Sequence, residues 1–240
     1  MMNARPGTDN SLRTPRFYKA CQWASRFIKF QCVRETVLHV ERVDAGVAAG
    51  GVLLACTHLS HLEPIVVSSI VRRQIRWMAR IEFYQRWWGG AVLRGGGAFP
   101  VDRFGFSLPA VRRGIRLARA GYAVGVFPEG GVVKGKSSVL RGGRIKLGVC
   151  VISLRTNTPI IPVVVLGTEK LNRVPPWIPP RRARLYTAFG TPIMPPIRAG
   201  GRLSAGRAER EEMGARLRAG FASTYHELLA HTGLTDSDVP

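Results

Sequence analysis

The sequence predicts an α/β fold, with a mixed, largely parallel sheet flanked by helices and a basic amphipathic helix at the N-terminus. Short apolar runs alternate along the chain with longer segments of helical periodicity, which is typical of βαβ units. The strongest apolar runs, at residues 51–56 and 159–166, fit strands that are buried on both faces. The chain has 240 residues, 45% of them hydrophobic, which is enough for one such domain with a substantial core.

The N-terminal segment divides into a polar tail and a basic helix. Residues 1–12 are polar, and we expect them to be disordered. Over residues 13–34, apolar side chains recur at intervals of three and four, and every charged side chain is basic. Tyr18, Trp23 and Phe30 lie off the main apolar stripe, which favours a helix in a membrane interface. An ordinary amphipathic helix packed on the domain has the same pattern, so both interpretations stay open.

The remaining elements follow in order over residues 35–240, which are expected to form one domain. Strands are predicted at 51–56, 75–79, 98–101, 123–127, 159–166 and 183–189. Helices are predicted at 62–73, 108–120, 146–154 and 204–231, while 83–92 is either irregular or helical. Pro64 is tolerated in a first helical turn, Gly121 ends a helix, and Ser204 suits an N-cap. The stretches 172–182 and 190–202 are rich in proline, glycine and arginine, and we expect loops there.

The charge of the chain favours an anionic partner. There are 36 Lys and Arg residues against 15 Asp and Glu residues, which gives a net charge of +21. Such an excess is typical of proteins that meet phospholipid headgroups, nucleic acid or a polyanionic cosubstrate. Arginine-rich codon usage explains the same excess, because only six of these residues are lysine. The sequence contains neither the apolar core of a signal peptide nor an apolar run of transmembrane length, so any membrane contact is expected at the surface.

The first candidate site is the segment 57–64, which follows the predicted strand 51–56 and opens a helix. The carboxyl ends of strands are where open α/β sheets build their sites. His58 and Glu63 stand five residues apart across this turn, so the carboxylate can hold one ring nitrogen and leave the other to accept a proton. His61 is a weaker candidate for the base, because no acid stands five residues after it.

Three further segments combine with the first into a specific pattern. They are Gly97 to Arg103, Phe127 to Gly130, and the apolar strand that carries Pro162. In this order the four segments resemble those of the glycerolipid acyltransferase family, which includes the lysophosphatidic acid acyltransferases. That family has an H-x-x-x-x-D block, a G-x-F-x-x-x-R block, an F-P-E-G block and a proline-bearing apolar strand. The resemblance covers residues 45–190 and identifies 35–240 as an acyltransferase domain.

The resemblance implies a role for each matching residue. His58 would be the general base on the acceptor hydroxyl, and Glu63 would hold it in place of the family's aspartate. Arg103 would bind the acceptor phosphate as a charge-assisted fork. The resemblance places Glu129 and Gly130 in the wall of the acceptor pocket. It places Pro162 in the block that lines the acyl donor site.

The chain departs from the family after Gly130. The family continues with Thr or Ser and then Arg, whereas this chain reads Gly131-Val132-Val133. If the family's phosphate ligand is replaced here, the replacement would be Lys134, Lys136 or Arg141. Without a replacement, the departure favours an acceptor that carries no phosphate.

The resemblance implies an O-acyltransferase that takes a fatty acyl group from acyl-CoA or acyl-carrier protein as cosubstrate. Its acceptor would be a lysophospholipid hydroxyl, foremost that of 1-acylglycerol-3-phosphate, in phospholipid biosynthesis. The alternatives are a lyso-aminolipid or glycolipid acceptor, or a basic nucleic-acid-binding protein. No nucleic-acid motif is present, so no specific nucleic-acid partner is expected. No Cys/His cluster has zinc spacing, so neither a metal nor a resident cofactor is expected. We expect a peripheral protein on an anionic membrane surface, at the cytoplasmic face.

Overall fold

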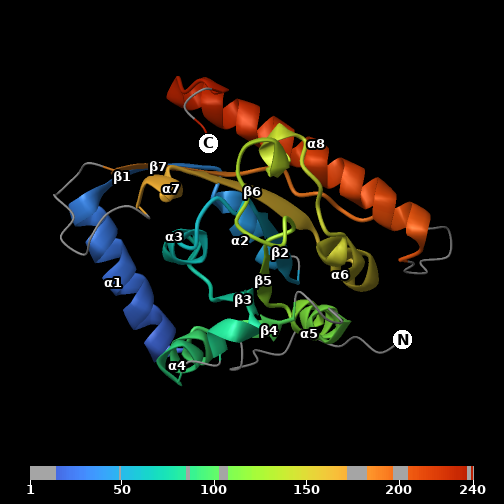
Figure 1. The fold of residues 1–240 in the computed structure, drawn as a ribbon. Coiled ribbons are helices and arrows are strands. Elements are labelled where there is room, and N and C mark those ends of the chain that lie inside the picture. The colour runs from blue at the N-terminus through green and yellow to red at the C-terminus, as the bar shows by residue number, and fades with distance from the viewer. Residues whose placement is uncertain are drawn as a thin grey trace.

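The fold was obtained as a computed structural model, and it describes residues 15–48, 50–84, 87–102, 108–171, 183–196, 205–236 and 239. The predicted disordered tail over residues 1–12 lies outside the described residues. Within them, seven strands form one sheet in the order β1-β7-β6-β2-β5-β3-β4 (Figure 1). The strands are β1 (Val33–Leu38), β2 (Val52–Cys56), β3 (Ile75–Arg80), β4 (Phe99–Val101), β5 (Ala123–Val126), β6 (Ile160–Leu166) and β7 (Ala183–Phe189).

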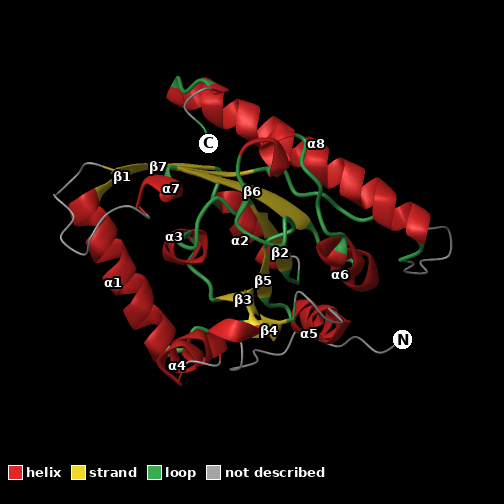
Figure 2. Ribbon diagram, in the orientation of Figure 1, coloured by secondary structure: helices red, strands yellow, loops and turns green. Residues whose placement is uncertain are grey.

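The sheet is largely parallel, as predicted. Neighbouring strands pair parallel throughout, except that β6 and β7 run antiparallel. Strands β2 and β6 are buried along their whole length, which explains their unbroken apolar sequences. Figure 2 shows the strands lying between helices. These are α1 (Arg16–Cys32), α2 (Glu41–Ala48), α3 (Glu63–Ile70), α4 (Trp87–Gly95), α5 (Leu108–Arg119), α6 (Gly148–Thr156), α7 (Thr168–Leu171) and α8 (Arg207–Thr232). Short 3-10 turns occur at η2 (Ile81–Tyr84), η3 (Gly135–Ser137) and η4 (Val139–Arg141).

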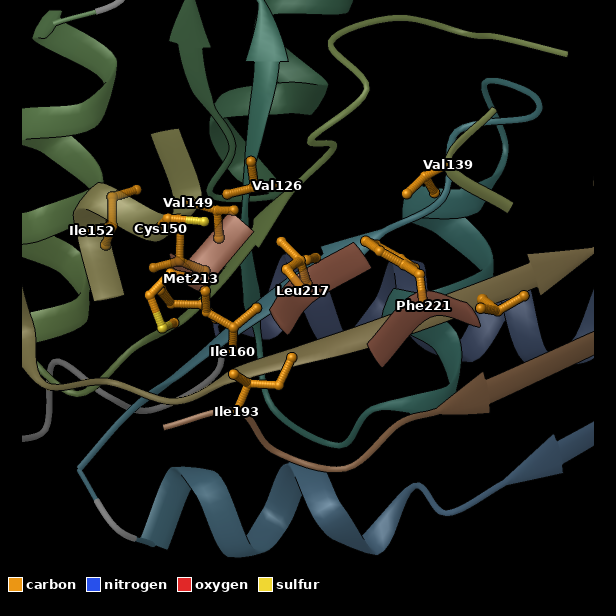
Figure 3. Packing of buried hydrophobic residues seen from close by; sticks show 14 of the residues in the cluster. Val126, Val139, Val149, Cys150, Ile152, Ile160, Ile193, Met213, Leu217 and Phe221 are labelled. Atoms are coloured by element: carbon orange, nitrogen blue, oxygen red, sulfur yellow. The ribbon is translucent and has the colours of Figure 1, made fainter. Parts of the chain in front are cut away.

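The two faces of the sheet carry separate cores. Alternate residues of β2 divide between them, with Leu53 in one core and Leu54 in the other. The first core joins the sheet to α5, α6 and α8, and Figure 3 shows Leu217 and Phe221 of α8 near Ile160 of β6. The second core joins the sheet to α2 and α3. The predicted arrangement of a sheet with helices on both faces is therefore confirmed.

Two elements at the start of the fold are absent from the sequence prediction. The N-terminal helix ends at Cys32, and the next two residues open β1 instead of continuing the helix. Strand β1 has exposed and half-buried positions and lies at an edge of the sheet, so its sequence lacks a clear apolar signal. Helix α2 is only eight residues long, which is too short for a distinct periodicity.

Helix α1 is docked on the domain through polar contacts. The Gln22 side chain donates to the carbonyl oxygens of Ser68 and Val71, at 2.7 and 2.8 Å, where α3 ends. The Tyr18 hydroxyl accepts a hydrogen bond from the Ile75 amide at the start of β3. These contacts satisfy backbone groups that a helix end and a strand start leave free. One face of α1 is therefore part of the domain.

Candidate active site

One crevice lies at the carboxyl ends of the central strands of the sheet. The crossover after β2 passes through α3 on one face, and that after β5 passes through α6 on the other. Open α/β sheets bind ligands where adjacent crossovers diverge in this way. A cleft of about 1000 Å³ lies there. His58, which directly follows the loop residue after β2, lines it.

The predicted pair of His58 and Glu63 comes together in the structure. The Nδ1 atom of His58 lies 3.2 Å from Oε2 of Glu63. Glu63 is completely buried, whereas 13% of the His58 side chain is exposed toward the cleft. Because Nδ1 faces the carboxylate, Nε2 is the ring nitrogen available to a substrate. The pair has the geometry of a general base with an orienting acid.

Two donors hold the other oxygen of Glu63. Oε1 accepts from the Ser60 amide and from the Thr168 hydroxyl, each at 2.6 Å. Thr168 follows β6, whose carboxyl end adjoins that of β2 because the two strands pair parallel. The carboxylate is therefore fixed by the turn that contains it and by a neighbouring strand. Thr168 is not among the residues predicted from the sequence, where its one signal is a hydroxyl residue just after a buried parallel strand.

The imidazole of His58 is held by an aromatic stack. Its ring centroid lies 4.1 Å from that of Phe127, which in turn lies 5.0 Å from Trp77. The Trp77 indole donates a 2.8 Å hydrogen bond to the Ser68 hydroxyl of α3. A ring packed in this manner has few alternative rotamers, so the base is pre-positioned. The phenylalanine of the F-P-E-G block thus contacts the base directly.

Glu129 lies next to the site but faces away from the cleft. Its Oε2 accepts a 2.6 Å hydrogen bond from the backbone amide of His58, and its Oε1 accepts from Ser138 and Val139. Burial raises the pKa of the Glu129 carboxyl above its usual value, and these hydrogen bonds and the charge of His58 oppose that rise. Glu129 does not line the cleft, so its geometry is that of a residue tying the His58 loop to residues 138–139. Any effect on the acceptor pocket would therefore be indirect.

Gly130 lines the cleft and brings a lysine to its wall. Its φ of +76° is natural only for glycine, and a Cβ there would lie 2.6 Å from Cε of Lys146. Lys146 also lines the cleft, and its backbone amide donates to the Pro128 carbonyl at 2.7 Å. The structure thus places a cation beside the F-P-E-G turn. The sequence pattern does not predict Lys146 at this position.

The three cations considered as replacements lie elsewhere. Lys134 and Lys136 are exposed and do not line the cleft. The Arg141 guanidinium pairs with the Asp236 carboxylate, which ties η4 to the segment after α8. The expectation that one of these three supplies the missing phosphate ligand is not supported, since Lys146 occupies the wall. Val133, within the departing segment, donates its amide to the His58 carbonyl at 3.0 Å.

Arg103 and Pro162, like Glu129, are not among the described residues that line the cleft. Arg103 lies outside the described residues, although Asp102, which precedes it, lines the cleft. Pro162 is buried in β6, and its ring approaches Gly190 and Gly220 on the side of α8. It is not among the described residues that line the cleft. The donor-site role of Pro162 and the phosphate role of Arg103 stay predictions.

The rest of the cleft is mostly apolar. Its walls come from both faces of the sheet and from helix α1. They include Phe17 and Tyr18 of α1, Ile65 of α3, Met78 of β3, Val111 of α5 and Val149 of α6. Apolar clefts of this size suit extended hydrophobic ligands. Within the described ranges, no three His, Cys, Asp or Glu side chains gather as metal ligands do.

A His–carboxylate pair in an apolar cleft, on an α/β sheet, is suited to an enzyme that removes a proton from a group of a hydrophobic substrate. The comparisons with known proteins agree. Residues 35–166 match the Acyltransferase family, and the chain belongs to that family.

The chain is also similar to two known proteins. The first is a 1-acyl-sn-glycerol-3-phosphate acyltransferase of Bacillus subtilis, 31% identical over 121 residues. That match covers 50% of this chain and spans only 58% of the relative's length. The second is the crystal structure of the 1-acyl-sn-glycerophosphate (LPA) acyltransferase PlsC from Thermotoga maritima. It has a TM-score of 0.57 at 17% identity, covering 86% of this chain and 77% of the other, and it confirms the fold.

Proposed function

We propose that this protein is an O-acyltransferase that moves a fatty acyl group from a thioester donor to the hydroxyl of a lysophospholipid. The observation that carries the proposal is the His58–Glu63 pair, with its free ring nitrogen at the edge of an apolar cleft of about 1000 Å³. The donor is acyl-CoA or acyl-carrier protein, and the foremost acceptor is 1-acylglycerol-3-phosphate, for phospholipid biosynthesis. The names of both relatives support this acceptor.

The proposed reaction needs no nucleophile from the protein. Nε2 of His58 takes the proton of the acceptor hydroxyl as its oxygen attacks the thioester carbonyl carbon. The carbon–sulfur bond then breaks, and the thiolate leaves with the proton that His58 returns. Glu63 stabilises the imidazolium that exists between the two transfers, because its buried carboxylate lies 3.2 Å from Nδ1. The products are an ester and a free thiol.

The cation at the cleft wall bears on the choice of acceptor. Lys146 is placed beside Gly130, close to where the family motif would carry its own phosphate ligand. A lysine is a compact point charge that commonly binds phosphate. This favours a phosphate acceptor in spite of Val132. A non-phosphate lysolipid is the second candidate, because Val132 stands exposed where the family has a polar residue.

A substrate panel tests the acceptor. The purified chain is incubated with labelled acyl-CoA and a set of lysolipids with and without phosphate, and the products are identified by mass. We expect 1-acylglycerol-3-phosphate to be used best. Lys146→Ala should raise the KM for this acceptor about 10- to 100-fold, the loss typical of one hydrogen bond to a charged group, and change the KM for the donor little. Arg103→Ala should do the same.

Lys134→Ala is the matched control, because it removes the same charge from an exposed position outside the cleft. It should behave like the wild type. If a lyso-aminolipid or glycolipid proves the better acceptor and Lys146→Ala leaves its KM unchanged, the non-phosphate alternative is correct. If no lysolipid is acylated by any thioester, the proposed function is wrong.

Helix α1 supports a membrane role for this function. Its outward face exposes Trp23, Phe27, Ile28 and Phe30, and the rings of Trp23 and Phe27 stack at 5.7 Å. The exposed fraction reaches 70% for Trp23, which is unusual for a residue of that size. We propose that this face enters the interface of an anionic membrane, while the other face stays docked on α3. Within the described residues, no helix combines the length and apolarity needed to cross a bilayer. A peripheral position at the cytoplasmic face is part of the proposal.

Changes to the outer face of α1 test the membrane role. Trp23→Ser/Phe27→Ser should weaken binding to phosphatidylglycerol vesicles about tenfold or more, since it removes two large apolar groups from the interface. Co-sedimentation at several salt concentrations measures the binding. The melting temperature should not fall, because both side chains are exposed. Point changes are preferable to deletion of residues 1–34, which would also remove part of β1 and the Gln22 contacts.

Leu108→Ser/Met194→Ser provides the control for this experiment. It removes two exposed apolar side chains from α5 and from the segment after β7. Its vesicle binding should equal that of the wild type. Equal losses in the two double variants, or none in either, would mean that α1 only covers the domain.

A further inference from the structure

A second hollow lies at the opposite end of the strands from His58. It has a volume of about 420 Å³ and is lined by Arg76, Arg94, Arg113, Arg116, Gly97, Ala98, Phe99, Leu117 and Tyr122. Arg76 is near the start of β3, Phe99 opens β4, and Tyr122 precedes β5. These are amino ends of parallel strands, whereas His58 follows a carboxyl end. Ala98 lines both hollows, so one wall is shared. We call this second hollow the arginine pocket.

Four guanidinium groups line the arginine pocket. Among the described residues that line it, none is acidic. Within the described part of the chain, no ion pair or side-chain hydrogen bond engages any of these four arginines. Like charges gathered in a hollow repel one another and attract anions.

The innermost arginine is built into the pocket. The guanidinium of Arg76 lies over the ring of Tyr122, 4.8 Å from its centroid. Its Nε atom is buried, with no hydrogen-bond partner among the described residues. Gly97 has a φ of +75°, and a Cβ there would lie 2.3 Å from Nη1 of Arg76. A Cβ at this position would displace the Arg76 guanidinium from its present place. A planar cation fixed on an aromatic ring is pre-organised, so little side-chain freedom is lost when it binds.

The outer arginines come from two helices. Arg113 and Arg116 stand three residues apart on α5 and so share one of its faces. Arg94 comes from the last turn of α4. Guanidinium groups match phosphate oxygens through paired N–H donors, and several of them around one hollow are typical of a phosphate site. The volume of the pocket suits a phosphate group with a small organic remainder.

We propose that the arginine pocket is a phosphate-binding site, separate from the acyl-transfer cleft, that takes the phosphate of a small organic phosphate. Two sources share this chemistry, the nucleotide phosphates of a CoA thioester and the headgroup of a phospholipid. The proposal does not require acyl transfer, because it concerns binding alone. Phosphate binding in the arginine pocket and acyl transfer at His58 are therefore tested independently of each other.

Calorimetric titration with three soluble probes tests the proposal. They are inorganic phosphate, adenosine 3′,5′-bisphosphate and dihexanoyl phosphatidic acid below its critical micelle concentration. The wild type should bind at least one of them saturably. Arg113→Gln/Arg116→Gln should weaken that binding at least about tenfold, since hydrogen bonds to charged groups are among the stronger ones. Both arginines are exposed, so this variant should keep the wild-type melting temperature.

Arg112→Gln/Arg218→Gln is the matched control. It removes two exposed arginines, one from the same helix, that do not line the arginine pocket. Its affinity for the probe should stay within about twofold of the wild type, because screening limits distant charges. Preference for the bisphosphate would assign the nucleotide end of the donor, and preference for phosphatidic acid would assign a lipid headgroup. Absence of saturable binding for all three probes, or equal losses in both double variants, would overturn the proposal.

Discussion

His58→Ala should lower kcat for acyl transfer by about a hundredfold to ten-thousandfold, the usual cost of losing a general base. The structure gives the reason, because the His58 ring lies between the buried Glu63 carboxylate and the cleft. Without the imidazole, the acceptor hydroxyl must lose its proton to water. The rate is measured with saturating acyl-CoA and lysolipid, and the melting curve is recorded for the same preparation.

The neighbouring histidine is the control for this experiment. His61 also lines the cleft, and its ring meets that of His58 edge-on at 5.9 Å. The Glu63 carboxylate lies against Nδ1 of His58, so the orienting acid serves that ring. His61→Ala should therefore cost much less than His58→Ala. If His58→Ala stays within a few-fold of the wild type while its melting curve is unchanged, the proton is taken by another group.

The pairing of His58 with Glu63 was predictable because it is local. Five residues separate the two, and a strand followed by a helix start brings them together without help from the rest of the chain. The aromatic neighbour Phe127 could also be identified from the sequence, because it belongs to the F-P-E-G motif. Its actual contact, a stack on the base, depends on β5 lying beside β2.

Other parts of the site were not predictable from the sequence, because they depend on pairing between distant segments. Thr168 reaches Glu63 across 105 positions of the chain, and only the parallel register of β2 and β6 joins them. The resemblance implies a pocket role for Glu129, whereas its carboxylate accepts hydrogen bonds from the backbone amides of His58 and Val139. The arginine pocket likewise draws on four separate elements. Because the chain is rich in arginine, no sequence signal distinguishes the four arginines of the pocket from the other arginines.

Glu63→Gln should lower kcat by up to about ten-thousandfold, as expected when a catalytic histidine loses its carboxylate. In the native site Oε1 accepts from Ser60 and Thr168, while Oε2 faces Nδ1 of His58. A glutamine has only one oxygen. If that oxygen serves the two donors, the amide NH₂ faces Nδ1 and favours the tautomer with its proton on Nε2, which cannot act as the base. If the side chain is reversed, its NH₂ group faces the Ser60 amide and the Thr168 hydroxyl, which are both donors. These buried donors are then left without an acceptor, which is costly.

The aspartate variant separates a catalytic role of Glu63 from a structural one. Glu63→Asp keeps the charge, and the family itself carries aspartate in this block, so it should retain substantial activity. Thr168→Val should fall between the two, because it removes one of the two donors to Oε1 and leaves the charge in place. For all three variants kcat is measured as a function of pH. The melting temperature of each is recorded, so that only variants with an intact fold are compared. Equal rates for Glu63→Gln and Glu63→Asp would show that the buried carboxylate serves only the start of α3, since a catalytic counter-charge would distinguish an amide from an acid.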